Sequence, residues 1–276
     1  MDKLTVEKLN KSFKNERDVT VVLKDIDLRI REKEYVSLLG PSGCGKTTML
    51  TIMAGFQKAD SGVVKVGDRI VKHPGPDRAF VFQSYALFPW MTLKDNILYP
   101  MKRQKISVEE RNERLNRLLS MAKLDGKENL FPHQLSGGMK QRTAVIRALA
   151  CRPEVLLMDE PLGAVDYQMR RELQEELETI FIKDTVTVVM VSHDIEEAVY
   201  MSDRVLLMSL DKGRIVEDLS IAMDRPRNRN SKQYKDYCDH LTEQLKRPQL
   251  QGIPGKAIAA NKVAMGKERV LQTKTS

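Results

Sequence analysis

A glycine-rich stretch that begins at Gly40 has the residue types and spacing of a loop that binds phosphate. It reads Gly40-Pro41-Ser42-Gly43-Cys44-Gly45-Lys46-Thr47, which fits the pattern G-x-x-x-x-G-K-[ST], and Thr48 follows. Glycines let backbone N–H groups turn inward around phosphate oxygens, and a helix that starts at the loop adds its positive end. Lys46 is expected to reach the β- and γ-phosphates of a nucleotide, and the Thr47 hydroxyl to bind Mg²⁺. The whole stretch from Gly40 to Thr48 is therefore a candidate nucleotide-binding segment.

Two carboxylates follow the apolar run Val155–Met158. Asp159, at the tip of a strand, can hold Mg²⁺ through the water shell of the ion. Glu160 is expected to orient and polarise the attacking water, because phosphoryl transfer depends on positioning and charge stabilisation. A solvated strand end would be the better interpretation of this pair alone, but the phosphate loop reverses that preference.

A second candidate phosphate site is the octapeptide Leu135-Ser136-Gly137-Gly138-Met139-Lys140-Gln141-Arg142. A hydroxyl and glycine amides lead here into residues 139–150, whose pattern is helical, so the positive end of a helix faces Ser136. One chain does not need two phosphate sites for one nucleotide. We therefore expect Ser136, Gly137 and Gly138 to close on the γ-phosphate of ATP that is held by a second copy of the chain.

These three motifs, in this order, resemble the ATP-binding cassette (ABC) family, and the resemblance covers about residues 3–220. It implies that Gln83 occupies the Q-loop, where it contacts Mg²⁺ and links a helical insertion to the core. It also implies that Phe13 stacks on the adenine ring and that His193 senses the γ-phosphate. Lys46, Gln83, Glu160 and His193 are then the expected catalytic residues. Residues 161–166 resemble the D-loop, which crosses to the opposite subunit and makes Asp166 a candidate nucleotide contact.

A narrower resemblance is carried by Gly75-Pro-Asp-Arg78, Val81-Phe-Gln83 and Leu87-Phe-Pro-Trp90-Met-Thr92, which are similar to the ATPases of nitrate, sulfonate and taurine importers. It implies a homodimer at the cytoplasmic face of the plasma membrane, bound to integral membrane permease subunits and served indirectly by an extracytoplasmic solute-binding protein. Phe88 and Trp90 follow the Q-loop, where the family docks its membrane subunit. The alternative is that both rings belong to the core of the helical insertion, and the transported solute stays open.

The elements that must position these residues can be predicted from apolar patterns. Alternation in Leu4–Leu9 and Thr20–Ile30 indicates antiparallel strands, and Tyr35–Leu39 is a strand that leads through the phosphate loop into a helix at 47–53. Further strands are predicted at 63–66, 79–82, 155–158, 186–191 and 205–208, with a helix at 169–180. Residues from about 90 to 150 are mostly helical, and 107–110 form a capping box. The predicted fold is thus α/β: a P-loop NTPase core with an antiparallel β subdomain and a helical insertion subdomain.

The charge distribution divides the chain near residue 225. Residues 225–276 contain 12 Lys or Arg and 4 Asp or Glu, whereas the remaining 224 residues contain 34 of each sign. We therefore expect an ABC ATPase domain at 1–225 and, since no clear period continues beyond it, a basic appendage or tail at 226–276. An alternative is a soluble ABC-type ATPase that acts on nucleic acid or in translation, but the neutral core argues against nucleic acid as a partner. A simple P-loop kinase would have no use for the octapeptide at 135–142.

The three cysteines, Cys44, Cys151 and Cys238, include no CxxC pair, so a disulfide framework or a zinc site is not expected and a reducing cytosol fits. No apolar run is long enough to span a bilayer and no leader pattern occurs, which predicts that the protein is neither exported nor self-anchored. Cys44, next to a helix N-terminus and near Lys46, is expected to be a reactive thiolate. The alternative is a thiol that is turned inward and inert.

Overall fold

The computed structural model describes residues 1–14, 18–163, 167–184, 186–247 and 250. Its strands are β1 (Asp2–Lys14), β2 (Val19–Arg31), β3 (Tyr35–Leu39), β4 (Ser61–Val66), β5 (Arg69–Ile70), β6 (Arg78–Val81), β7 (Val155–Asp159), β8 (Thr187–Val191), β9 (Arg204–Met208) and β10 (Ile215–Ser220). Its helices are α1 (Lys46–Ala54), α2 (Leu93–Arg103), α3 (Val108–Met121), the short 3₁₀ helix η1 (Pro132–Gln134), α4 (Gly137–Leu149), α5 (Tyr167–Asp184), α6 (Ile195–Met201) and α7 (Lys232–Leu245).

The strands form two sheets. An antiparallel sheet has the order β2-β1-β4-β5, and a six-stranded sheet has the order β10-β9-β3-β8-β7-β6. The second sheet is parallel except for its edge strand β10, which runs antiparallel to β9. The predicted combination of an antiparallel β subdomain with an α/β core is therefore confirmed.

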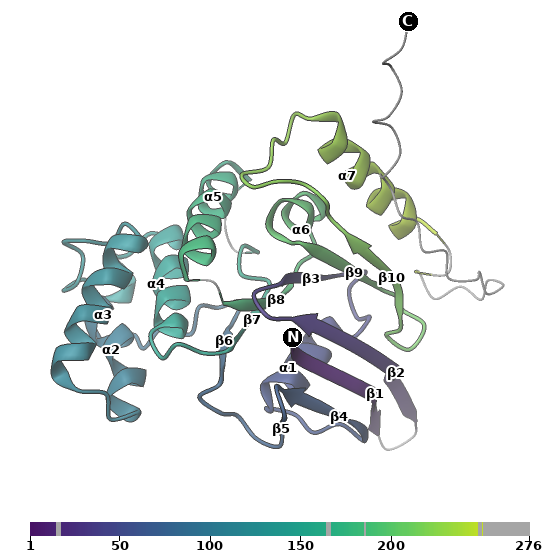
Figure 1. The fold of residues 1–276 in the computed structure, drawn as a ribbon, viewed down its shortest axis with the longest axis horizontal. Helices are drawn as coiled ribbons and strands as arrows, with labels where there is room; N and C mark the ends of the chain where they lie inside the picture. Colours follow the sequence, from purple (N-terminus) through teal and green to yellow (C-terminus); the bar gives the residue numbers. More distant parts are fainter. Residues whose placement is uncertain (15–17, 164–166, 185, 248–249, 251–276) are drawn as a thin grey trace, which may run out of the picture.

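The six-stranded sheet separates two hydrophobic cores, because successive side chains of a strand point to opposite faces. In β3, Val36 and Leu38 enter a small core that also holds α1 and the antiparallel sheet. Tyr35 and Leu39 of the same strand enter a large core that holds α2 to α7. The molecule thus has layers, with α4, α5 and α6 on one face of the sheet and α1 on the other (Figure 1). Since every central strand is covered on both faces, its near-continuous apolar sequence is explained.

All regular elements within residues 90–150 are helices, as predicted. This helical part lies at one end of the sheet (Figure 1). Ser107 caps α3 by accepting a hydrogen bond from the Glu110 backbone N–H at 3.2 Å. The Glu110 carboxylate pairs with Arg114 instead of returning to the cap. The apolar face of α3 is buried in the large core at Leu115, Leu118 and Leu119, together with Ala122, which follows the helix. Within the described parts of the chain, no helix combines the length and apolar character needed to cross a bilayer.

The expectation that no clear period continues beyond residue 225 is wrong in the range that the structure describes, because α7 follows there. Ser231 caps α7 by accepting from the Tyr234 N–H at 3.2 Å, and Tyr234, Tyr237 and Leu241 are buried in the large core. The Tyr234 hydroxyl donates to the Glu196 carbonyl at 2.8 Å, which fixes α7 against α6. The division of the chain at residue 225 stays a prediction.

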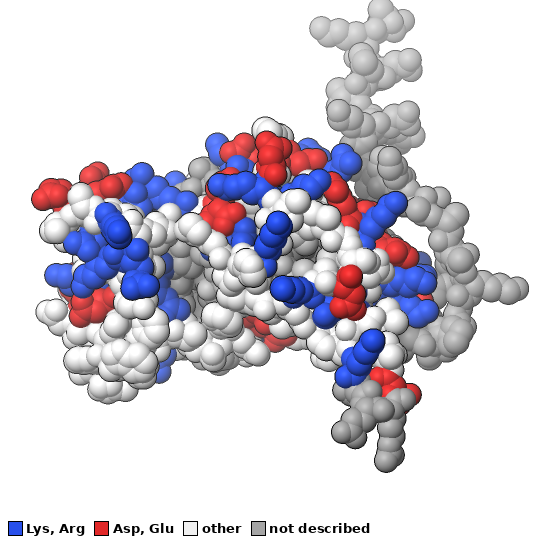
Figure 2. Space-filling model, turned by 90° about the horizontal axis from the view of Figure 1, so that it is seen from below, with Lys and Arg blue, Asp and Glu red and all other residues white. Residues whose placement is uncertain are grey.

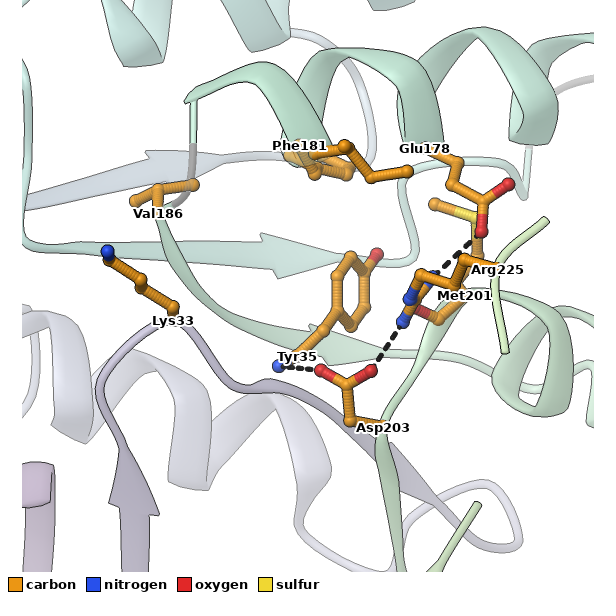
Figure 3. A pocket seen from close by; sticks show the side chains of 9 residues that line it. Lys33, Tyr35, Glu178, Phe181, Val186, Met201, Asp203 and Arg225 are labelled. Atoms are coloured by element: carbon orange, nitrogen blue, oxygen red, sulfur yellow. Dashed lines mark hydrogen bonds and ion pairs between the residues drawn. The ribbon is translucent and has the colours of Figure 1, made fainter. Parts of the chain in front are cut away.

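Arginines fasten this C-terminal segment (residues 225–247) to the rest of the core. The Arg225 guanidinium donates to Glu178 Oε1 at 2.9 Å and to Asp203 Oδ1 at 2.8 Å, at one end of a cavity of about 140 Å³ that Tyr35 and other side chains line (Figure 3). Arg227 is almost fully buried. Its guanidinium donates to backbone carbonyls at the end of α6, those of Val199, Tyr200 and Ser202. These bonds satisfy carbonyls that the end of a helix leaves without intrahelical partners.

Candidate nucleotide-binding site

The sheet topology brings four of the predicted segments to one edge. Strands β3, β8, β7 and β6 are parallel neighbours, so their carboxyl ends lie together. Leu38 pairs with Val191, and Val191 pairs with Asp159. Each of these strand ends carries one predicted segment: the phosphate loop after β3, His193 after β8, the Asp159–Glu160 pair at the end of β7, and Gln83 after β6. In open α/β sheets this edge is where ligands bind.

The phosphate loop joins β3 to α1 and depends on its glycines. Gly45, the residue that precedes α1, has φ 102°, a left-handed value that favours glycine. A Cβ atom there would lie 2.9 Å from Leu23 Cδ2, so the antiparallel sheet approaches the loop closely. Lys46 is buried, and its Nζ donates to the carbonyls of Gly40 at 2.8 Å and Pro41 at 3.0 Å. The loop therefore folds around the Lys46 ammonium group.

Cys44 does not match the expectation of a reactive thiolate. Its side chain is 1% exposed and belongs to the small core. Burial raises the pKa of the Cys44 thiol, and the nearby Lys46 charge lowers it by less. The inward orientation, which was the alternative interpretation, is therefore the one that the structure has. Cys44 contributes its backbone to the loop and its thiol to packing.

Thr47 and Asp159 come together from α1 and β7. The Thr47 hydroxyl donates to Asp159 Oδ1 at 3.0 Å. Burial raises the pKa of the Asp159 carboxyl, and the charge of Glu160 contributes in the same direction. A hydroxyl and a carboxylate are hard oxygen donors, and Mg²⁺ takes few such protein ligands beside phosphates and water. The donor set of this pair therefore fits Mg²⁺.

The Glu160 carboxylate is the meeting point of the candidate catalytic residues. Gln83 Nε2 donates to Glu160 Oε2 at 3.1 Å, and His193 Nε2 forms a close contact with Glu160 Oε1. Glu160 itself has φ 47°, and its N–H donates to the Val191 carbonyl at 3.1 Å. A left-handed conformation is costly for a residue with a side chain and is often found at functional sites. Two residues that follow two other strands, Gln83 after β6 and His193 after β8, thus converge on the carboxylate that follows β7.

The octapeptide around Ser136 forms the start of α4. Ser136 is the N-cap, and its hydroxyl accepts from the Met139 N–H at 3.3 Å. Ser136 and Gly137 are exposed, and a Cβ atom added to Gly137 would meet nothing within 4 Å. Among the hydrogen bonds of the described residues, none joins Ser136, Gly137 or Gly138 to the phosphate loop of the same chain. The motif therefore presents open backbone to the outside.

Phe13 and Asp166 are the other two predicted nucleotide contacts, and the structure describes only Phe13. Phe13, on β1, is 40% exposed, and the Lys11 ammonium group lies 5.4 Å from its ring centroid. A half-exposed ring next to a cation is available for stacking. Asp166 lies outside the described residues.

Two residues that no sequence motif singled out contact the neighbours of Gln83 and His193. Glu197, buried on α6, is hydrogen-bonded to the hydroxyl of Ser192, the residue before His193. Burial raises the pKa of Glu197 to about 7. The spacing from Asp194, the N-cap of α6, to Glu197 is that of a capping box and was a usable signal. Arg147, on α4, binds the loop after Gln83, and no sequence pattern predicts that contact.

Comparisons with known proteins agree with this geometry. The profile described as ABC transporter matches residues 23–163. The nitrate import ATP-binding protein NrtD of Synechococcus elongatus is 41% identical over 226 residues, which are 81% of this chain and 82% of that protein. The spermidine/putrescine import ATP-binding protein PotA of Thermobifida fusca is 44% identical over 215 residues, which are 77% of this chain and 56% of that protein. A dimeric ATP-binding cassette in a post-hydrolysis state with ADP and Pi has a TM-score of 0.68 at 32% identity, covering 80% of this chain and 100% of that one.

Proposed function

Because this chain belongs to the ABC transporter family of ATP-binding proteins, as its motifs predict, we propose that it powers the import of a small solute across a membrane. It is an ATPase of import systems, and ATP is its substrate. The observation that carries the proposal for its mechanism is the contact of Glu160 with both Gln83 and His193, beside the Thr47–Asp159 pair.

The phosphate loop binds the nucleotide in this proposal. Its N–H groups donate to the phosphate oxygens at the positive end of α1, and Lys46 moves from the carbonyls of its own loop to the β- and γ-phosphates. Phe13 stacks on the adenine ring. Thr47, Asp159 and Gln83 would hold Mg²⁺, which would neutralise phosphate charge.

Glu160 is the general base for hydrolysis. Its carboxylate accepts a proton from the water that attacks the γ-phosphorus. The bond from that phosphorus to the β–γ bridging oxygen breaks as the new P–O bond forms, which leaves ADP and inorganic phosphate. Gln83 and His193 hold the carboxylate from two sides through the contacts described above. The protein does little covalent chemistry in this reaction. The barrier is therefore lowered mainly by holding the base and the water in the right positions.

A second copy of the chain completes each site. The exposed Ser136 and Gly137 lie at the positive end of α4, with the buried Gly138 directly behind them, and in this proposal they bind a γ-phosphate held by the other copy. Asp166, in the segment that resembles the D-loop, is a further candidate nucleotide contact in this proposal. The dimeric cassette with ADP and Pi supports this arrangement.

Permease subunits dock on the helical part. Trp90 is 70% exposed, and it clusters with Phe88 and Tyr99 at ring-centroid distances of 5.6 and 5.0 Å from Phe88. Over this end of the molecule Figure 2 shows clusters of charged side chains and, beside them, a smaller area without Lys, Arg, Asp or Glu. Exposed apolar surface of this kind marks an interaction site. Docking there places the chain at the cytoplasmic face of the plasma membrane, and an extracytoplasmic solute-binding protein acts on the far side.

The motifs at 75–92 favour a nitrate-, sulfonate- or taurine-like cargo. NrtD and PotA, which are named for an anion and for polycations, are almost equally similar to this chain. The cassette therefore carries little information on the solute, and the permease is expected to select it.

Glu160→Gln tests the proposal. The amide keeps the shape of the side chain but cannot accept the proton, so ATP turnover should fall by about two to four orders of magnitude. ATP binding should persist, and the ATP-bound variant should elute as a dimer. Glu196→Gln, an exposed substitution on α6, is the control and should hydrolyse ATP normally. Near-normal hydrolysis by Glu160→Gln would refute the assigned base.

A further inference from the structure

The loop after Gln83 is held by an arginine of α4. Arg147 Nη1 donates to the Ala86 carbonyl at 2.7 Å, and Nη2 donates to the Tyr85 carbonyl at 2.9 Å. The two terminal amino groups of one planar guanidinium group thus bind consecutive carbonyls, a geometry that fixes orientation as well as distance. The same guanidinium lies 5.7 Å from the centroid of the Phe88 ring.

The two residues that Arg147 holds have an uncommon backbone conformation. Tyr85 has φ 64° and Ala86 has φ 45°, and neither is glycine. Such residues persist only where their surroundings fix them. The Tyr85 N–H donates to the Phe82 carbonyl at 2.9 Å, so the strained turn directly encloses Gln83. The conformation of this turn sets where the Gln83 side chain meets Glu160.

Arg147 is a half-buried arginine without a carboxylate partner among the described residues. None of the ion pairs in the described residues involves it, and burial lowers its pKa without an acidic neighbour to oppose the effect. A half-buried cation without a carboxylate is costly, and carbonyl oxygens and an aromatic face are its compensation. Its helix, α4, begins at Ser136, so one rigid element carries both the exposed hydroxyl at its start and this clamp in its last turn.

We propose that Arg147 is a positioning residue for ATP hydrolysis, which fixes the turn at Tyr85 and Ala86 so that Gln83 is held against Glu160. The inference rests on the roles proposed above for Gln83 and Glu160. A second anchor lies further along the loop, where buried Asn96 donates to the Phe88, Met91 and Thr92 carbonyls. Arg147 is the anchor nearer to Gln83. Because Arg147 lies on α4, a displacement of α4 relative to the sheet would be passed through Arg147 to the turn at Tyr85 and Ala86.

Arg147→Met removes the donors and keeps much of the side-chain length, and Arg147→Lys keeps the charge with a single donor group. The matched control is Arg114→Met, because Arg114 is also half-buried and also donates to a backbone carbonyl, that of Ala150 at 3.0 Å, but far from Gln83 in sequence. Three quantities are measured in each full-length variant: kcat and KM for ATP, equilibrium ATP binding, and hydrogen exchange of the amides of residues 83–90.

In Arg147→Met we expect kcat to fall by about 10- to 100-fold, the scale of a small misplacement in a catalytic site. KM and ATP binding should stay within about twofold of wild type, because the phosphate loop is untouched. Exchange at 83–90 should accelerate in this variant and stay at the wild-type rate in Arg114→Met. Arg147→Lys should recover part of kcat and part of the protection.

The proposal is overturned if Arg147→Met or Arg147→Lys exchanges faster at 83–90 while kcat stays at the wild-type value. It is also overturned if kcat falls equally in Arg114→Met, since the loss is then one of stability. Should Arg147→Met not fold, the lysine variant decides by the same two criteria. Failure of the proposed function has a different signature, namely wild-type turnover in Glu160→Gln.

Discussion

The buried carboxyl of Glu197 makes a quantitative prediction about pH. Glu197 is 4% exposed, and one of its oxygens, Oε1, has no hydrogen-bond partner among the described residues. Its pKa rises from 4.5 to about 7, chiefly through burial; the Ser192 hydroxyl and Arg170 oppose the rise, and Asp194 and Glu160 add to it. A raised carboxyl pKa means that the folded state holds the proton more tightly than the unfolded state does.

The sign of the effect follows from this linkage. Below pH 4.5 both states are protonated and the group costs nothing, whereas stability is lost as the pH rises through about 7. Each pKa unit is worth about 1.4 kcal/mol, so the full loss above pH 7 is about 3 kcal/mol. Glu197→Gln cannot ionise and escapes that loss. The unfolding free energy of the variant, relative to wild type, should therefore rise by about 2–3 kcal/mol between pH 5 and pH 8.

Urea denaturation of both proteins at a series of pH values measures this difference. Glu196→Gln is the control on the same helix, because the pair of Glu196 with Arg171 is exposed and its loss should cost about 1 kcal/mol or less at either pH. A difference between Glu197→Gln and wild type that is constant from pH 5 to pH 8 would refute the reasoning, since the buried carboxyl would then not titrate with folding.

Three further predictions concern the nucleotide site and the C-terminal segment. Ser136→Glu should abolish hydrolysis without weakening ATP binding to the monomer, and mixing it with Lys46→Ala should restore some activity through the one intact composite site; no recovery at any mixing ratio would count against action in trans. Maleimide at neutral pH should leave the ATPase active, because Cys44 is buried and its thiol pKa is raised, and inactivation that mass mapping assigns to Cys44 would contradict this. Leu241→Ala should lower the free energy of unfolding by about 2–5 kcal/mol in thermal or urea denaturation, because Leu241 is fully buried, and a loss below 1 kcal/mol would show that α7 is not part of the core.

Much of the nucleotide site could be predicted because its residues are consecutive in sequence and follow apolar strands. The G-x-x-x-x-G-K-[ST] pattern and the Asp159–Glu160 pair each lie at a strand end, and parallel strands bring such ends together. The direction of a single side chain is a different matter. Cys44 sits beside a helix N-terminus that favours the thiolate, but packing against Gly40 and the small core outweighs that preference.

Contacts between distant segments could not be predicted from one sequence. Arg147 binds carbonyls that lie 61 and 62 residues earlier, and a carbonyl leaves no mark on residue type. α7 is an intermediate case. Tyr234, Tyr237 and Leu241 recur at helical spacing behind a Ser231 cap, which is a detectable signal, but the surrounding charges hide it from a reading of overall polarity.

The contacts of residues 225–247 with α6 affect how the chain folds during its synthesis on the ribosome. Helices α5 and α6 leave the ribosome before Arg225 and Arg227, so Glu178 and the carbonyls at the end of α6 lack these partners until the C-terminal segment is synthesised. At about 5–20 residues per second, the 23 residues from 225 to 247 take roughly 1–5 s to add. During that interval the nascent chain has a phosphate loop and a Glu160 that are complete in sequence, but a large core that is open on the side of α6. Nascent chains that end before α7 should therefore be good chaperone substrates, and those that extend past Leu245 should not.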